Sequence, residues 1–249
     1  MKPLNLPDVV DYIHQNIGPL YHEKKIAKLK AMTLDDIVKR KNPYLFKAKR
    51  ANDAAEFVKA VLDATVSSGE ETVFGNFLEN VGIHVCELVH GGRKSGITGM
   101  DLEFEDGTTK YLISIKSGPN WGNAGQIKNL DRCFIEAKKT LATSGGAKGM
   151  TIVCVEACCY GVDDSPEKGT RLKLCGQRFW ELVSGGSETL YRDIIEPLGY
   201  LAKERNEELD ELYLVKKNLF VEGFVNRFCD DGVINWDRLV IYNSGKKRP

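Results

Sequence analysis

Apolar residues recur at helical spacing along most of the chain. Residues 8–32 and 33–40 predict two amphipathic helices, and Thr33 stands where an N-cap of the second would stand. Residues 54–67 and 70–89 predict two more, with a break expected at Ser67-Ser68-Gly69 because small, flexible residues cluster there. Further helices are predicted over these stretches: residues 126–140, about 176–184, 187–196 and 198–230.

Strand-like alternation occurs between residues 99 and 116. Acidic and apolar residues alternate over its first part, with the acids at Asp101, Glu103 and Glu105. A tight turn is predicted at Glu105-Asp106-Gly107, because Asp-Gly tolerates the positive φ that hairpin turns need. Residues 111–116 then alternate again and end at Lys116. Pairing of the two strands would bring Asp101 close to Lys116, and a carboxylate beside an ammonium can hold a divalent cation and a phosphate.

A third strand is predicted over residues 150–157, an apolar run rich in β-branched residues. A helix separates it from the hairpin, which predicts a crossover back into the same sheet. We therefore expect an α/β fold with a central mixed β-sheet of about four to five strands flanked by helices, and helical additions at both ends. The expected regions are a basic helical region at 1–50, a core at 51–165 and a mainly helical region at 166–249, packed as one compact unit.

Composition supports a folded protein and excludes several classes. Apolar residues make up 42% of the 249 residues, and no apolar run approaches the ~20 residues that a membrane-spanning helix needs. The first residues lack the apolar segment of a secretion signal, so we expect a cytoplasmic protein with no membrane contact. The seven cysteines show no metal-ligand spacing and are expected to be reduced and mostly buried.

Charge is unevenly distributed, although the formal net charge is zero. Between Lys24 and Arg50 there are ten Lys and Arg residues and only two acidic residues. This asymmetry favours a face that binds a polyanion, and the alternative is an ordinary solvated helix surface. The candidates for contacts to nucleic-acid phosphates are Lys39, Arg40, Lys41, Arg93 and Lys94.

The hairpin resembles the core of the PD-(D/E)XK nuclease superfamily. Asp101 matches the superfamily's Asp, and Ser114-Ile115-Lys116 occupies the place of its acidic-x-Lys motif, with Ser114 where a metal-binding acid is expected. Segments elsewhere are similar to type II restriction endonucleases of the PmeII-like group. These segments are residues 41–49, 70–79, 117–123 and 173–180.

The resemblance implies a restriction-endonuclease-like core that hydrolyses DNA with Mg²⁺, for which Mn²⁺ can substitute. It implies a catalytic set of Asp101, Ser114, Lys116 and Glu79. Asp101 and the carbonyl of Ile115 are the expected metal ligands, and Lys116 takes the role of the catalytic lysine. The candidates for the carboxylate that Ser114 lacks are, in order, Glu79, Asp131, Glu71 and Glu103. Ser114 itself can hydrogen-bond a metal-bound water.

Polar residues gather directly after Lys116 and are candidates for contacts to DNA. Side-chain amides can pair with adenine edges, and an indole can stack on a base or pack under its loop. These candidates are Asn120, Trp121, Asn123 and Gln126.

A type II restriction endonuclease acts on double-stranded DNA. Cutting both strands of a palindrome calls for two active sites, so a homodimer is expected, and no nucleotide cofactor. The alternative is a catalytically inactive or structure-specific nucleic-acid-binding protein on the same fold, with a role in repair or recombination.

Overall fold

A computed structural model describes residues 1–246, so the last three residues of the predicted C-terminal region lie outside the described residues. Contacts divide the chain into two compact units. The sheet unit comprises Met1–Ile17 and Phe74–Tyr200, and the helical unit comprises Gly18–Val73 and Leu201–Pro249. The boundaries expected after residues 50 and 165 do not coincide with this division, because each unit combines segments that are far apart in the sequence.

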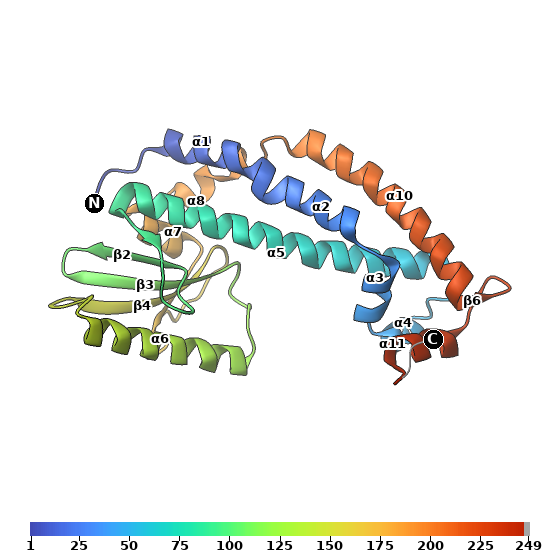
Figure 1. Ribbon diagram of the computed structural model, residues 1–249. Helices are drawn as coiled ribbons and strands as arrows, with labels where there is room; N and C mark the ends of the chain where they lie inside the picture. Colours follow the sequence, from blue (N-terminus) through green and yellow to red (C-terminus); the bar gives the residue numbers. More distant parts are fainter. Residues whose placement is uncertain (247–249) are drawn as a thin grey trace. The chain divides into compact units, whose positions relative to one another are not determined.

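The sheet unit contains a five-stranded sheet with strands in sequence order. The strands are β1 (Arg93–Lys94), β2 (Leu102–Asp106), β3 (Thr109–Lys116), β4 (Thr151–Cys158) and β5 (Leu172–Cys175). The first three pair antiparallel and the last three parallel, with α6 (Ala124–Ser144) as the crossover from β3 to β4 (Figure 1). The predicted α/β fold with a mixed sheet of four to five strands is confirmed. The sequence pattern missed β1 and β5, which are too short to show alternation.

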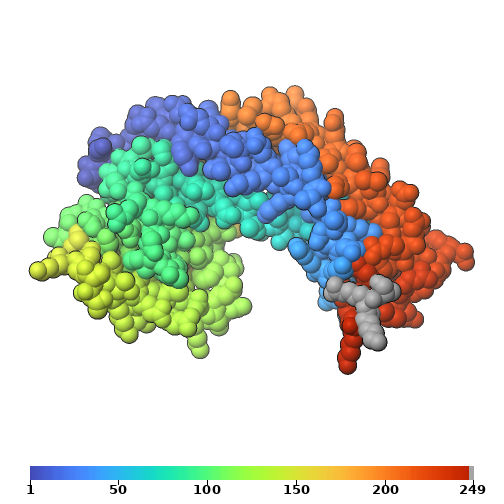
Figure 2. Space-filling model, in the orientation of Figure 1, coloured from blue at the N-terminus to red at the C-terminus, as the bar shows by residue number. Residues whose placement is uncertain are grey.

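Helices cover both faces of this sheet. On one face α6 packs Leu130 and Phe134 against Leu112 of β3 and Cys154 of β4, and Figure 2 shows α6 in yellow-green at the surface of this unit. Figure 1 places the second half of α5 (Ala54–His90) and α7 (Gln177–Ser184) on the opposite face. The unit is completed by α1 (Leu6–Ile17), α8 (Leu190–Asp193) and α9 (Ile195–Leu198).

The hairpin turn lies further along the chain than predicted. Asp106 pairs with Thr109, so the loop is Gly107-Thr108 rather than Glu105-Asp106-Gly107. Gly107 has a φ of 58° and is the only one of the two loop residues with positive φ, the pattern of a type II′ turn. Asp106 thus extends the strand, and the glycine alone supplies the left-handed conformation.

The predicted break at Ser67-Ser68-Gly69 is wrong. Residues 54–90 form one helix, α5, of 37 residues. A glycine inside a helix costs only about 1 kcal/mol relative to alanine. Fully buried apolar side chains on both sides of the glycine, including Leu62 and Phe77, hold the helix in place and outweigh this cost.

The helical unit contains the predicted capped helix. Thr33 and Asp36 form a capping box at the start of α3 (Leu34–Arg40). The stretch 8–32, predicted as one helix, is divided into α1, a π-helical turn (Gly18–His22) and α2 (Glu23–Ala31). Pro19 explains the division, because proline lacks the N–H that a regular helix would use. The remaining elements are α4 (Pro43–Ala48), the first part of α5, α10 (Ala202–Phe228), β6 (Cys229–Asp230), β7 (Val233–Ile234) and α11 (Trp236–Ser244).

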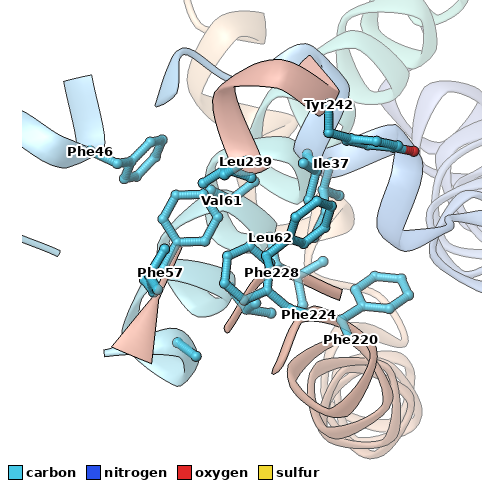
Figure 3. Packing of buried hydrophobic residues seen from close by; sticks show 14 of the residues in the cluster. Ile37, Phe46, Phe57, Val61, Leu62, Phe220, Phe224, Phe228, Leu239 and Tyr242 are labelled. Carbon is cyan, nitrogen blue, oxygen red and sulfur yellow. The ribbon is translucent and has the colours of Figure 1, made fainter. Parts of the chain in front are cut away.

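Aromatic side chains form the core of the helical unit (Figure 3). Phe57 of α5 packs between Phe46 of α4 and Phe224 of α10, with ring centroids 5.0 and 4.8 Å apart. Phe228 contacts both Phe224 and Tyr242 of α11. Elements from both ends of the chain therefore share one apolar core. None of the helices within residues 1–246 is long and apolar enough to cross a membrane.

Candidate active site

Asp101 and Lys116 lie side by side where β2 begins and β3 ends. The backbone N–H of Asp101 donates to the carbonyl of Ile113 at 2.8 Å, which fixes the start of β2 on β3. The Nζ of Lys116 lies 3.8 Å from Oδ2 of Asp101, and both side chains are about one quarter exposed. The predicted proximity of the two residues is confirmed, and it creates a half-open site with one carboxylate and one ammonium.

Ser114 joins the two charged groups. Its buried hydroxyl accepts a 2.8 Å hydrogen bond from Nζ of Lys116 and donates one of 3.2 Å to Oδ2 of Asp101. The backbone N–H of Ile115 donates to the same oxygen at 2.7 Å. In a strand the N–H and C=O of one residue point to the same side, so the Ile115 carbonyl faces the edge where Asp101 lies.

Glu79 approaches this pair from α5. Burial raises the pKa of its carboxyl, and the nearby charge of Asp101 raises it further. The charges of Lys94 and Lys116 lower this pKa but do not cancel the rise. Its Oε1 is 4.0 Å from Nζ of Lys94. The helix comes close here because Gly75, one turn earlier, has no side chain: a Cβ at that position would lie 3.1 Å from Cβ of Ser117.

The other candidate acids have partners or are exposed. Asp131 on α6 accepts hydrogen bonds from Thr170 and, at 2.5 Å, from Arg171. Glu103 is buried and accepts from Arg93 at 2.5 Å and from Ser95 at 3.1 Å. Glu71 is exposed. Glu79 is thus the acid that the structure brings into the electrostatic surroundings of Asp101.

Within residues 1–246 no group of three or more His, Cys, Asp and Glu side chains is arranged to hold a metal ion. The donor set at the site nevertheless suits Mg²⁺, which takes one or two carboxylates and fills its octahedron with water and other oxygens. Glu79 would bring a second carboxylate to this donor set, since the charge of Asp101 contributes, after burial, to the raised pKa of its carboxyl.

The sequence pattern missed Glu156, which lies in the middle of an apolar strand. It stands on β4 opposite Ser114 and is 1% exposed. Its Oε2 accepts from Nε of Arg171 at 2.6 Å, and its Oε1 accepts from Nε1 of Trp121 at 2.8 Å, with Nζ of Lys173 at 3.4 Å. Burial raises the pKa of Glu156, but these donors outweigh burial and lower it. An acid within an otherwise apolar strand was the available signal.

A cavity of about 530 Å³ opens beside Lys116. It is lined by residues of β3, of the loop after Lys116 and of α6, among them Ser114, Trp121 and Asn129. The ring of Trp121 lies with its centroid 5.2 Å from Nζ of Lys116.

A family model described as type II restriction endonuclease EcoO109I matches residues 7–206. The match covers most of the chain, including the whole of the sheet and the site. The chain belongs to this restriction endonuclease family. A search of curated proteins returns no match. The family agrees with the resemblance noted in the sequence, and the PmeII-like subgroup stays a prediction.

The side-chain amides expected to contact DNA differ in how many hydrogen bonds they already make within the protein. Asn123 and Gln126 form a reciprocal capping box at the start of α6, in which each side-chain oxygen accepts the other residue's backbone N–H. Their NH₂ groups and one lone pair of each amide oxygen are left for other partners. Asn120 is exposed.

The basic residues expected to contact phosphates differ in how closely an acidic side chain already pairs with them. In the helical unit Nζ of Lys39 is 2.9 Å from Asp35, whereas Arg40 is 3.9 Å from Asp36. Arg40 and Lys41 line a cavity of about 440 Å³ with Lys28. In the sheet unit, Arg93 and Lys94 are about three quarters exposed although each faces a glutamate.

Proposed function

We propose that the protein is a Mg²⁺-dependent type II restriction endonuclease that hydrolyses both strands of double-stranded DNA at a specific site. The observation that carries the proposal is the Asp101–Lys116 pair at the end of β3, on a chain whose family is that of a restriction endonuclease. Phosphodiester hydrolysis needs an attacking water and stabilisation of the charge that develops on the phosphate. Asp101 provides a carboxylate that can bind a cation, and Lys116 provides an ammonium beside it. Together the two groups meet both requirements.

Asp101, Glu79 and the carbonyl of Ile115 would hold the metal ion. Bound there, Mg²⁺ would lower the pKa of a coordinated water and offset phosphate charge, and Mn²⁺ would substitute because it accepts the same oxygen ligands.

The residues of the chain have separate roles in this proposal. Lys116 orients the attacking water and offsets negative charge on the scissile phosphate. Ser114 fixes the ammonium of Lys116 through the 2.8 Å hydrogen bond. Asp101 would help to hold the metal, and the backbone N–H of Ile115 and the hydroxyl of Ser114 fix its carboxylate by donating to Oδ2.

The partner is double-stranded DNA, and cutting both strands calls for two copies of the site. We therefore propose a homodimer with twofold symmetry acting on a palindromic sequence. Backbone phosphates would be contacted by the exposed cations Arg93, Lys94 and Arg40 and by the partly buried Lys41, which position the duplex without reading it. The exposed amide of Asn120 is the candidate for reading base edges.

A second candidate is a binding protein on the same fold that has lost catalysis. The observation that favours it is Ser114, which provides a hydroxyl where the motif has a metal-binding acid. A binder has no need of the Asp101–Lys116 pair, which supports the enzyme instead.

The test is incubation of the purified protein with supercoiled plasmid and Mg²⁺, followed by sequencing of the ends. If the protein is a restriction endonuclease, the products should be linear with ends at one short recurrent sequence. No products should form when EDTA removes the metal. Retarded but uncut DNA in Mg²⁺ and in Mn²⁺ would favour the binding protein. Ends scattered over branched or damaged DNA alone would favour a structure-specific nuclease.

A further inference from the structure

The ammonium of Lys116 lies over the face of an indole ring. Its Nζ is 5.2 Å from the ring centroid of Trp121, within the range of a cation–π interaction. The two residues are joined by the loop that follows β3. The head group of Lys116 thus contacts the hydroxyl of Ser114 and the ring of Trp121, in addition to the carboxylate of Asp101.

The ring is itself anchored. Nε1 of Trp121 donates to Glu156, whose carboxylate is also held by Arg171 and by Nζ of Lys173. Nζ of Lys173 also donates to the carbonyl of Pro119 at 2.9 Å, so the loop is tied to the sheet at two points. A buried carboxylate with this many donors has little freedom, and it holds the indole in one place.

Several contacts already engage the ring of Trp121. Trp121 is partly buried against the apolar cluster that α6 forms on the sheet, and its one polar atom is used by Glu156. Lys116 lies over its ring. Stacking on a base, one of the two roles that the sequence suggests for Trp121, would have to displace the lysine from this face of the ring.

We propose that Trp121, anchored by Glu156, is a positioning residue for Lys116. It restricts the flexible four-carbon side chain so that Nζ stays between Ser114 and Asp101. This inference rests on the proposed function, because the positioning matters for cleavage only if Lys116 acts in it. It assigns Trp121 to the chemical step and not to DNA affinity.

The test combines a structural and a kinetic measurement. In protein labelled with ¹³C at lysine Cε, assigned through Lys116→Arg, the Lys116 signal should be shifted by the ring current, and Trp121→Leu should abolish that shift. The single-turnover cleavage rate at saturating enzyme should fall about tenfold, the size of a partly desolvated cation–π contact. The Kd for the same duplex, measured with Ca²⁺ in place of Mg²⁺, should change by less than about twofold. The reason is that Trp121 is not expected to contact the DNA in the ground state.

Conservative and control variants make the result specific. Trp121→Phe keeps a ring below Lys116 but removes the N–H that donates to Glu156, so its rate should fall between those of wild type and Trp121→Leu. This variant takes the place of Trp121→Leu if that one fails to fold, and a wild-type rate in it would contradict the anchoring by Glu156. Trp236→Leu is the matched control, because Trp236 makes a similar contact with Lys47, at 5.0 Å, in the helical unit. Its cleavage rate should equal that of the wild type once folding is verified by melting.

A weaker Kd with an unchanged single-turnover rate in Trp121→Leu would overturn the inference in favour of base stacking. An unchanged rate and Kd would overturn it outright. If the wild-type protein cuts no DNA, the proposed function fails, and the ring-current shift still decides whether Trp121 holds Lys116.

Discussion

Ser114 Oγ and Lys116 Nζ are joined by a hydrogen bond of 2.8 Å on one face of β3. A hydroxyl therefore stands where the acidic-x-Lys motif has a carboxylate. It can orient the ammonium, but it is neutral and cannot offset the charge of a divalent cation. If a metal ion binds at Asp101, its second carboxylate must come from another element.

We predict that Glu79→Gln lowers the cleavage rate at least about 100-fold, because it removes one of the two carboxylates proposed to hold the metal. The variant should fold as well as the wild type at pH 8. The pKa of Glu79 is raised in the folded protein, so its charged form opposes folding above that pKa, and a neutral glutamine removes this cost. Cleavage rates over a Mg²⁺ titration, with melting temperatures alongside, measure both effects.

Asp131→Asn is the matched control, because its carboxylate is engaged by Arg171. It should retain cleavage close to wild type if the variant folds. Ser114→Glu should restore part of the activity lost in Glu79→Gln. An active Glu79→Gln together with an inactive Asp131→Asn would show that α6 supplies the ligand.

Arg40 and Lys41 are predicted to contact backbone phosphates. Replacing both with glutamine should weaken binding to cognate and random duplexes alike. The slope of log affinity against log salt should shrink by about 0.9 for each phosphate that is no longer neutralised, because each neutralised phosphate releases condensed counterions. The control is the double variant Lys59→Gln, Lys217→Gln, which has the same change of charge. Both of these lysines lie outside the cavity that Arg40 lines. Equal slopes in the two variants would show that the basic run is a solvated surface.

Lys39 is expected to act mainly through the fold. The pKa of Asp35 is lowered by hydrogen bonds from Tyr242, Lys39 and Arg227, which join α3 to α10 and α11. Asp35→Asn should therefore cost on the order of 1 kcal/mol of unfolding free energy at pH 7, a modest figure because the pairs are partly exposed.

The sign of the pH dependence follows from the lowered pKa of Asp35. Its stabilisation is fully present above the unfolded value near 3.8 and is lost as the pH falls through the folded value. Melting temperatures of wild type and Asp35→Asn should therefore differ at pH 7 and converge in strong acid. Asp231→Asn, at an exposed turn, should show no such difference.

Asn120 and Asn123 should give different phenotypes although both follow Lys116. Asn123→Ala removes an N-cap and should cost about 1 kcal/mol of stability. Asn120→Ala should leave stability unchanged and reduce the preference for cognate over random DNA about tenfold if the amide pairs with a base edge. Competition binding and thermal melts separate the two, and an Asn120→Ala protein with full preference would remove this residue from base readout.

Local patterns predicted the parts of the fold that depend on neighbouring residues. The hairpin, the crossover helix and the Thr33 cap were all visible in the sequence, and the register brought Asp101 to Lys116 although the turn lies at Gly107-Thr108. The break at Gly69 was wrongly predicted, because packing along α5 outweighs a local preference.

Contacts between distant segments could not be predicted in this way. The Glu156 carboxylate is satisfied by Trp121, 35 residues earlier, and by Arg171, 15 residues later. Nothing in the spacing of either residue indicates this arrangement. The strand β5, which carries Lys173 beside Glu156, was missed because four residues are too few to show alternation.

The most direct test of the account compares wild type, Asp101→Asn and Lys116→Ala in cleavage of plasmid with Mg²⁺, with binding to the same DNA measured in Ca²⁺. Wild type should give linear DNA with uniform ends. Both variants should lose cleavage by at least about 1,000-fold while still binding, and without a divalent cation Asp101→Asn should bind more tightly than wild type because a negative charge beside the phosphate is removed. Full cleavage at the same ends by either variant would contradict the assignment of this site.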